Sequence, residues 1–201
     1  MSEEVTAVAC HPSQTLVAIA CSNGVLQVWN YDMKLLMILR EFNSNPMQGT
    51  RGEDRKTKVK NHLRPSCVAF DSSGKVLAVG FTTGLIKLLF TDNLEDGSSY
   101  APSSEAILCM KFSTSGKFLA AYDSSRHVLL FKKDEPAQDI EEEGHTTVPF
   151  SRSGNKPTSP HRISSAPPKI TPTSFIYIGR ARSHTSSISG IVFGIKDGVE
   201  T

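Results

Sequence analysis

The two residues best suited to catalysis are the neighbours Cys10 and His11, because a thiol beside an imidazole can form a nucleophilic dyad. Cys10, however, ends an apolar run. Two similar runs later in the chain have Phe70 and Phe112 where the first run has Cys10. A free cysteine in such a run behaves as a small buried hydrophobe. We therefore predict that Cys10 is a structural thiol and not a nucleophile.

The other residues that could do chemistry do not form a recognisable set. No GxSxG, GxxxxGK(S/T) or HExxH motif occurs. The four cysteines include no CxxC pair, and no histidine is spaced from them as a zinc ligand would be. We predict no catalytic residue, no cofactor site, no metal site and no small-molecule substrate, and hence a protein that is not an enzyme.

Composition and charge limit the functional classes to which the chain could belong. The chain has 201 residues, 38% of them hydrophobic, and its 22 Lys and Arg against 20 Asp and Glu leave a net charge of +2. That balance does not favour a nucleic-acid-binding protein. The longest aliphatic run, residues 35–39, is far shorter than the roughly 20 residues that span a bilayer. The acidic start has no secretory signal. We expect an intracellular protein with no membrane partner.

The chain repeats itself three times. The pairs Cys10 and Trp29, Phe70 and Leu89, and Phe112 and Phe131 are each 19 positions apart. The second and third repeats are offset by 42 residues, and the first and second by 60, because a polar stretch of 18 residues intervenes. A period of about 40–45 residues is typical of four-stranded propeller blades.

Each repeat predicts short antiparallel strands. Apolar runs of five or six residues are separated by turn signals such as Asn23-Gly24, Ser73-Gly74 and Thr83-Gly84. Because the runs are apolar on both faces, we expect strands buried between stacked sheets. Further outer strands are expected at residues 34–42 and 174–180. This predicts an all-β chain, a partial propeller of three blades of the four-stranded type.

A fourth repeat is expected to begin near the end of the chain. His184 precedes Ile188, Ile191 and Phe193 at the spacing of a first strand. Gly144-His145 is a weaker candidate for the start of a blade, because Pro149 and Arg152 would then fall at core positions. We assign the structural core of the repeats to eight residues: Cys10, Trp29, Phe70, Leu89, Phe112, Phe131, His184 and Phe193.

The repeats and the inserts between them divide the chain into six segments. Residues 1–42 form the first repeat with its outer strand, 61–100 the second and 101–131 the third. Residues 43–60 are a polar and basic insert, and 132–173 a Ser- and Pro-rich insert that we expect to be disordered. Residues 174–201 hold an outer strand and the truncated fourth repeat.

The repeat pattern resembles the WD40 family over about 130 residues. The strings at residues 9–31, 68–84 and 182–194 are similar to those of axonemal WD-repeat proteins, which are scaffold subunits near the radial-spoke bases of motile cilia. The usual Trp-Asp ending is replaced by Trp29-Asn30 and its counterparts. The Asp usually found six positions earlier is replaced by Asn23, Thr83 and Ser125, so blade stability should depend on apolar packing.

Propellers need at least about four blades, so this chain is expected to be a fragment or short isoform of a longer one, or to be completed by another chain. The resemblance implies a non-catalytic scaffold in the cilium or flagellum axoneme, whose partners are other proteins of radial-spoke-associated complexes. The alternative is a soluble WD-repeat adaptor, either a ubiquitin-ligase substrate receptor or an RNA-processing scaffold.

Candidate partner contacts lie in turns and inserts. The turn candidates are Asn23, Thr83, Asp123, Ser125 and Arg126, and the basic candidates are Arg55, Lys56, Lys58 and Lys60. The pattern favours a solvated loop for the basic stretch; an acidic protein surface is the next interpretation, and nucleic acid the least favoured, because no aromatic residue is interleaved. Ser159 and Thr171 precede prolines and are candidate phosphosites, although a solvated insert without a role is the favoured interpretation there.

Overall fold

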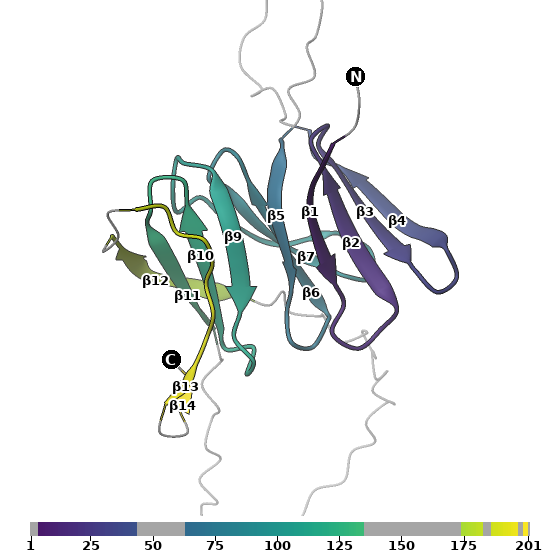
Figure 1. Cartoon of the computed structure of the whole chain (residues 1–201). Coiled ribbons are helices and arrows are strands. Elements are labelled where there is room, and N and C mark those ends of the chain that lie inside the picture. The colour runs from purple at the N-terminus through teal and green to yellow at the C-terminus, as the bar shows by residue number, and fades with distance from the viewer. Residues whose placement is uncertain (1–3, 44–62, 135–173, 183–185, 197–198, 201) are drawn as a thin grey trace, which may run out of the picture. The chain divides into compact units, whose positions relative to one another are not determined.

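The computed structural model describes residues 4–43, 63–134, 174–182, 186–196 and 199–200, with side chains up to Gly194. The described chain forms three four-stranded antiparallel sheets, each a blade (Figure 1). The first blade has the order β1 (Val5–Cys10), β2 (Leu16–Cys21), β3 (Val25–Asn30) and β4 (Leu35–Glu41). The second has β5 (Pro65–Phe70), β6 (Val76–Phe81), β7 (Ile86–Phe90) and β8 (Asp96–Tyr100). The third has β9 (Ile107–Phe112), β10 (Phe118–Asp123), β11 (Val128–Lys133) and β12 (Phe175–Ala181).

The three-repeat, all-β prediction is therefore confirmed. The expected outer strands at residues 34–42 and 174–180 correspond to β4 and β12. The central strand of the second blade, β6, is buried at every position, as its two-sided apolar run predicts.

Turn glycines let neighbouring blades approach closely. Gly84 has φ +80°, and a Cβ there would lie 2.0 Å from the carbonyl oxygen of Ser103. L-residues rarely adopt that φ, so the turn requires glycine on both counts. The equivalent turn of the third blade has Arg126 at φ +69° instead.

Each blade has two faces, defined by the strand register. One row across the first blade is Cys10, Val17, Trp29 and Leu36. The matching rows are Phe70, Leu77, Leu89 and Asp96 in the second blade, and Phe112, Leu119, Phe131 and Tyr177 in the third. We call the face that carries these rows the back face and the opposite one the front face.

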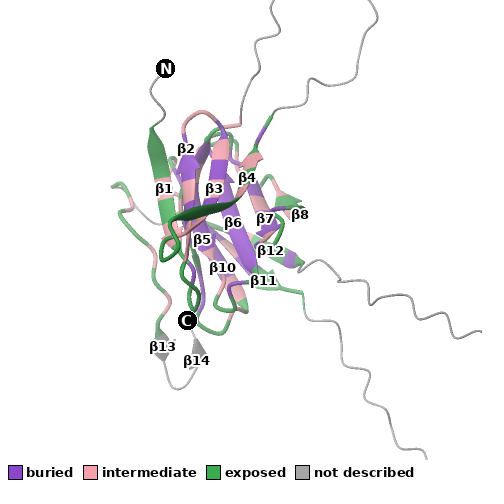
Figure 2. Ribbon diagram, turned by 90° about the vertical axis from the view of Figure 1, so that its right-hand side faces the viewer, coloured by how far each residue is buried: buried purple, intermediate pink, exposed green. Residues whose placement is uncertain are grey.

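The hydrophobic core consists of two layers between successive blades. Ala18, Ala20, Leu26 and Val28 from the front face of the first blade pack with the second blade's back-face residues, which include Leu77 and Leu89. Cys67, Ala69, Ala78 and Leu88 from the front face of the second blade pack with Phe112, Leu119 and Phe131 of the third. Apolar residues of one front face thus pack against apolar residues of the next back face. Figure 2 shows the result: β6 is largely buried, whereas β1 and β4 are largely exposed.

The sequence did not reveal β8. Its first four residues, Asp-Gly-Ser-Ser, have no apolar or β-branched side chain that would indicate a strand. The strand forms because its backbone pairs with β7, from Ile86↔Tyr100 to Leu89↔Asp96. Main-chain pairing at the rim of a blade does not depend on apolar side chains, so the hydrophobic pattern carries no signal there.

The expected fourth repeat has no strand ladder within the described residues. Residues 186–194 are not assigned to a strand, and Phe193 is half-buried. A first strand gains its ladder from the second strand of its own blade, and the described chain supplies none at this place; only the short hairpin β13 (Ile195–Lys196) and β14 (Val199–Glu200) follows. His184, Gly144-His145, the basic stretch with Arg55, Lys56, Lys58 and Lys60, and Ser159 and Thr171 lie outside the described residues.

Candidate interaction surfaces

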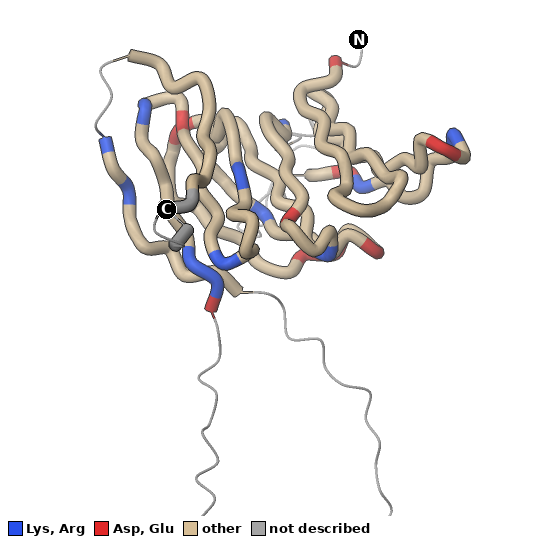
Figure 3. The backbone as a smooth tube through the Cα atoms, turned by 60° about the horizontal axis from the view of Figure 1, so that its bottom comes forward, with Lys and Arg blue, Asp and Glu red and all other residues tan. Residues whose placement is uncertain are grey.

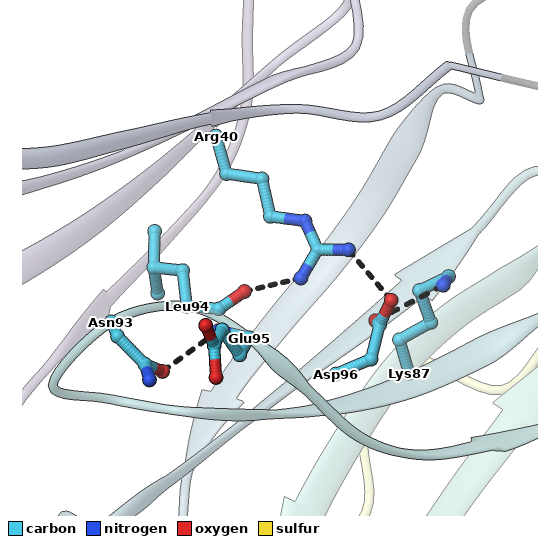
Figure 4. Close-up of polar contacts among 6 residues, drawn as sticks. All are labelled: Arg40, Lys87, Asn93, Leu94, Glu95 and Asp96. Carbon is cyan, nitrogen blue, oxygen red and sulfur yellow. Dashed lines mark hydrogen bonds and ion pairs between the residues drawn. The ribbon is translucent and has the colours of Figure 1, made fainter.

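An ionic cluster joins the outer strands of the first two blades (Figure 4). Arg40 on β4 donates from one guanidinium nitrogen to Asp96 on β8 at 2.8 Å and from the other to the carbonyl of Leu94. Lys87 on β7 donates to the second oxygen of Asp96 at 3.0 Å. The guanidinium also lies 5.0 Å from the ring centroid of Phe42, a cation–π distance. One arginine therefore connects the first blade to both the turn and the outer strand of the second.

A cavity of about 290 Å³ lies at this cluster and is lined by Arg40, Glu41, Phe42, Asn43, Leu63, Lys87 and Asp96. Burial opposes ionisation of Asp96, but hydrogen bonds from Arg40 and Lys87 and their positive charges outweigh it and hold the pKa of that carboxyl below its usual value. Two cations and two carboxylates, those of Asp96 and Glu41, thus line the cavity. The cluster has no surplus charge to attract an ionic ligand, and its geometry suits a clasp between blades.

A second polar network lies in the third blade. Asp123 is buried, with 1% of its surface exposed. Its Oδ2 accepts from Ser103 Oγ at 2.8 Å and from His127 Nδ1 at 3.1 Å, and its Oδ1 accepts from the His127 backbone N–H at 2.9 Å. Because Ser103 and His127 both bond to the carboxylate and not to each other, the trio does not activate the serine hydroxyl. It ties the loop before β9 to the β10–β11 turn.

Cys10 and His11 do not form a hydrogen-bonded pair in the structure. Both ring nitrogens of His11 are engaged: Nδ1 accepts from the backbone N–H groups of Ser13 and Gln14, and Nε2 contacts the carbonyl of Gly74. The burial expected for Cys10 is wrong, because its side chain is exposed. The cause is tertiary: among the described residues, no sheet covers the back face of the first blade.

The other cysteines lie deeper in the structure. Cys21 and Cys67 are buried and Cys109 is half-buried. Burial, together with the nearby Cys109, raises the pKa of Cys67 to about 12. The thiol of Cys67 is therefore protonated at neutral pH and packs as a hydrophobe.

The predicted turn candidates separate into two groups. Thr83 is exposed, and Asn23, Ser125 and Arg126 are half-buried, so each can reach solvent. Asp123 cannot act as a partner contact, since it is buried in the network with His127. The sequence of this short polar turn does not distinguish the buried Asp123 from its more exposed neighbours, because Ser103, which bonds to the Asp123 carboxylate, lies twenty positions earlier.

The predicted repeat-core residues also differ in burial. Leu89, Phe112 and Phe131 are buried, with 1%, 7% and 0% exposed. Phe70 and Trp29 are half-buried. Burial therefore increases from the first blade to the third at equivalent positions, because the first blade lacks a covering neighbour among the described residues.

Sequence reasoning missed Arg40, Lys87 and Asp96. Arg40 and Asp96 are 56 positions apart, and no local motif marks either residue. The third blade is the most basic, with Lys111, Lys117, Lys132, Lys133 and Arg180 among its charged residues. Figure 3 marks the Lys and Arg positions of the described chain in blue. In the part of the chain that the structure describes, no cluster of His, Cys, Asp and Glu could hold a metal ion, and no helix could cross a membrane.

Comparisons with known proteins show what these blades resemble. The model of the "WD domain, G-beta repeat" family matches residues 2–30. The solved "Structure of U3-55K" covers 66% of this chain and 37% of its own, with a TM-score of 0.53 and 16% identity. At that identity the likeness shows the fold alone: the three four-stranded sheets are arranged as part of a β-propeller.

Curated relatives align with nearly the whole chain. Cilia- and flagella-associated protein 251 of Mus musculus is 23% identical over 96% of this chain, and the protein of that name from Tetrahymena thermophila is 24% identical over 94%. The Chlamydomonas reinhardtii protein of that name is 22% identical over 95%. The chain spans 11%, 16% and 17% of these relatives, respectively.

Proposed function

We propose that this chain is a non-catalytic WD-repeat scaffold of the cilium or flagellum, and that it holds other proteins near the radial-spoke bases of the axoneme. The observation that carries the proposal is the alignment of nearly the whole chain with cilia- and flagella-associated proteins of a mammal, a ciliate and a green alga.

The blade architecture supports a binding role. Two buried layers and the clasp of Arg40, Lys87 and Asp96 hold the three sheets together, so the exposed turns and outer strands are presented on a rigid support. Rigid surfaces bind with a smaller loss of conformational entropy than flexible ones. Among the described residues, the polar networks with buried members serve packing, which agrees with a scaffold better than with an enzyme.

Fractionation of ciliated cells tests the proposal. The endogenous protein should remain with axonemes after detergent extraction and be released at high salt, as expected for a partly ionic protein–protein contact. Recovery wholly in the soluble cytosol or the nucleus would exclude the axonemal role and favour the soluble adaptor.

The basic stretch can be tested in the same assay. Replacing Arg55, Lys56, Lys58 and Lys60 with Glu in the full-length protein should lower the salt concentration that releases it, if this stretch contacts an acidic protein. The matched control reverses four exposed cations of the third blade, Lys111, Lys132, Lys133 and Arg180. Equal effects of the two sets would indicate non-specific charge and not a site in the basic stretch.

A further inference from the structure

The outer strand of the first blade exposes an unusual amount of apolar surface. On β4, Leu35, Leu36, Met37 and Leu39 are 55%, 42%, 56% and 46% exposed. No charged residue lies between positions 35 and 39. Met37 stands at a β-bulge, where the register with β3 skips one residue, so β3 does not pair with it.

Packing between blades does not account for this surface. The back face of the second blade is covered by the first, yet its outer strand β8 begins Asp-Gly-Ser-Ser. A blade can therefore be covered by its neighbour while its outer strand stays polar. The exposed apolar surface of β4 is therefore larger than a covering blade would require. The third outer strand, β12, also exposes an apolar run, Ile176, Tyr177 and Ile178, but this run is shorter than that of β4 and is followed by Gly179 and Arg180.

The backbone of β4 limits what can cover it. β4 is the last strand of its sheet, so every second N–H and C=O along it points away from β3. A partner that covered the apolar side chains without pairing these groups would bury unsatisfied donors and acceptors. The partner is therefore expected to be a β-strand that extends the sheet.

The charges at the ends of β4 indicate which β-strand would pair with it. Lys34 precedes the apolar stretch and Glu41 ends it, and both side chains are exposed. In an antiparallel pair of two β4 strands centred between Met37 and Ile38, each Lys34 lies opposite the other copy's Glu41. Leu36 lies opposite Leu39 in the same register. Opposite charges at the two ends, with five apolar residues between them and Arg40 already bonded to Asp96 of its own chain, make β4 complementary to itself.

We propose that two copies of this chain associate through β4, which pairs with itself edge to edge and antiparallel to form one continuous eight-stranded sheet. Such an isologous contact closes after two copies, which is the commonest symmetry of soluble oligomers. It also covers the kind of long apolar edge that otherwise promotes aggregation.

Analytical ultracentrifugation of the purified 201-residue chain tests the proposal. The chain should show a concentration-dependent monomer–dimer equilibrium, and Glu41→Lys should raise the dissociation constant by at least about tenfold, because two like-charged pairs then face each other. Lys34→Glu should have the same effect. The double variant Lys34→Glu with Glu41→Lys should restore dimerisation, since it exchanges the charges and keeps them opposite.

Ile178→Lys on β12 is the matched control, because it places a charge on an equally exposed outer strand of another blade. It should leave the dimer unchanged, and circular dichroism should show the same strand content in every variant. A chain that stays monomeric at all concentrations would overturn the proposal. So would a dimer that Ile178→Lys disrupts and Glu41→Lys does not, or a double variant that stays monomeric.

Disulfide trapping gives a second measurement that does not depend on affinity. With Met37→Cys, two copies place their new thiols on neighbouring strands beside the two-fold axis, within the Cα separation of about 4.4–6.8 Å that a disulfide spans. Mild oxidation should yield a covalent dimer, whereas Ile178→Cys should not. Equal crosslinking of the two variants would contradict pairing through β4.

Discussion

His11 Nε2 lies 3.1 Å from the carbonyl oxygen of Gly74, which links the β1–β2 turn of the first blade to the β5–β6 turn of the second. Since His11 Nδ1 accepts two backbone N–H bonds, Nε2 carries the proton and donates it to Gly74. The ring also packs edge-on against Phe70, with the ring centroids 5.1 Å apart. The histidine that looked like half of a catalytic dyad is a connector between blades.

Replacing His11 with Ala should lower the free energy of unfolding by about 1–3 kcal/mol, because it removes the bond to Gly74 and the contact with Phe70 and leaves a gap in a buried site. Urea denaturation followed by circular dichroism measures the loss. Gln14→Ala is the control, since Gln14 is exposed and contributes only its backbone N–H. Equal midpoints for the two variants would contradict the connector role.

Replacing Gly80 with Ala should destabilise the chain by about 1–3 kcal/mol through overpacking. A Cβ there would lie 2.6 Å from Cys67 Sγ and 2.9 Å from Ile107 Cγ2 on the third blade. Adding Cys67→Ala should recover part of the loss in a double-mutant cycle, because it removes the closest atom. Gly190→Ala is the control, since nothing lies within 4 Å of its Cβ position. No difference between Gly80→Ala and Gly190→Ala would refute the close approach.

Asp123 should make the stability of the chain depend on acid pH. Burial opposes its ionisation, but hydrogen bonds from His127 and Ser103 outweigh this and hold the pKa of Asp123 below its usual value of 3.8. Since the folded-state pKa is the lower one, the carboxylate stabilises the fold above pH 3.8, and this contribution is lost as the pH falls through the folded-state pKa.

Asp123→Asn should therefore be less stable than the wild type at neutral pH, and the difference should shrink as the pH falls below about 4. Urea midpoints from pH 7 to strongly acidic pH measure the trend. Asp92→Asn, at an exposed position, is the control. A difference that does not change with pH would mean that the charge of Asp123 contributes nothing to folding.

The clasp between Arg40 and Asp96 should give a small coupling energy. The Asp96 side chain is 45% exposed, so solvent screens the pair and a double-mutant cycle of Arg40→Ala and Asp96→Ala should give about 0.2–1 kcal/mol. The coupling should decrease at high salt. Coupling above that range at all salt concentrations would indicate a more buried pair than the structure shows.

Thr91 offers a stabilising substitution. Its side chain is 7% exposed, and its Oγ1 has no hydrogen-bond partner in the structure. Thr91→Val keeps the shape and removes an unsatisfied hydroxyl, so it should raise the free energy of unfolding by about 1 kcal/mol. Thr6→Val is the control, because the Thr6 hydroxyl donates to the carbonyl of Ala20. A loss of stability in Thr91→Val would show that the hydroxyl has a partner in solution.

The sequence by itself determined the repeat and its register. Phe70 and Leu89 have the same spacing as Phe112 and Phe131, and the structure places both pairs in the same row of their blades. This information is local, because alternation of side chains along a strand and turn residues such as Gly74 and Gly84 specify strands and turns without reference to distant residues.

Only the tertiary structure decided which of these equivalent residues are buried. Trp29 and Phe131 hold the same place in their repeats, yet Phe131 is fully buried and Trp29 is half-buried, because a blade lies against one and not against the other. Asp123 and the clasp of Arg40 with Asp96 follow the same rule. Asp123 is bonded by Ser103, twenty positions earlier, and Arg40 by Asp96, 56 positions later in another blade, and no local pattern marks either pairing.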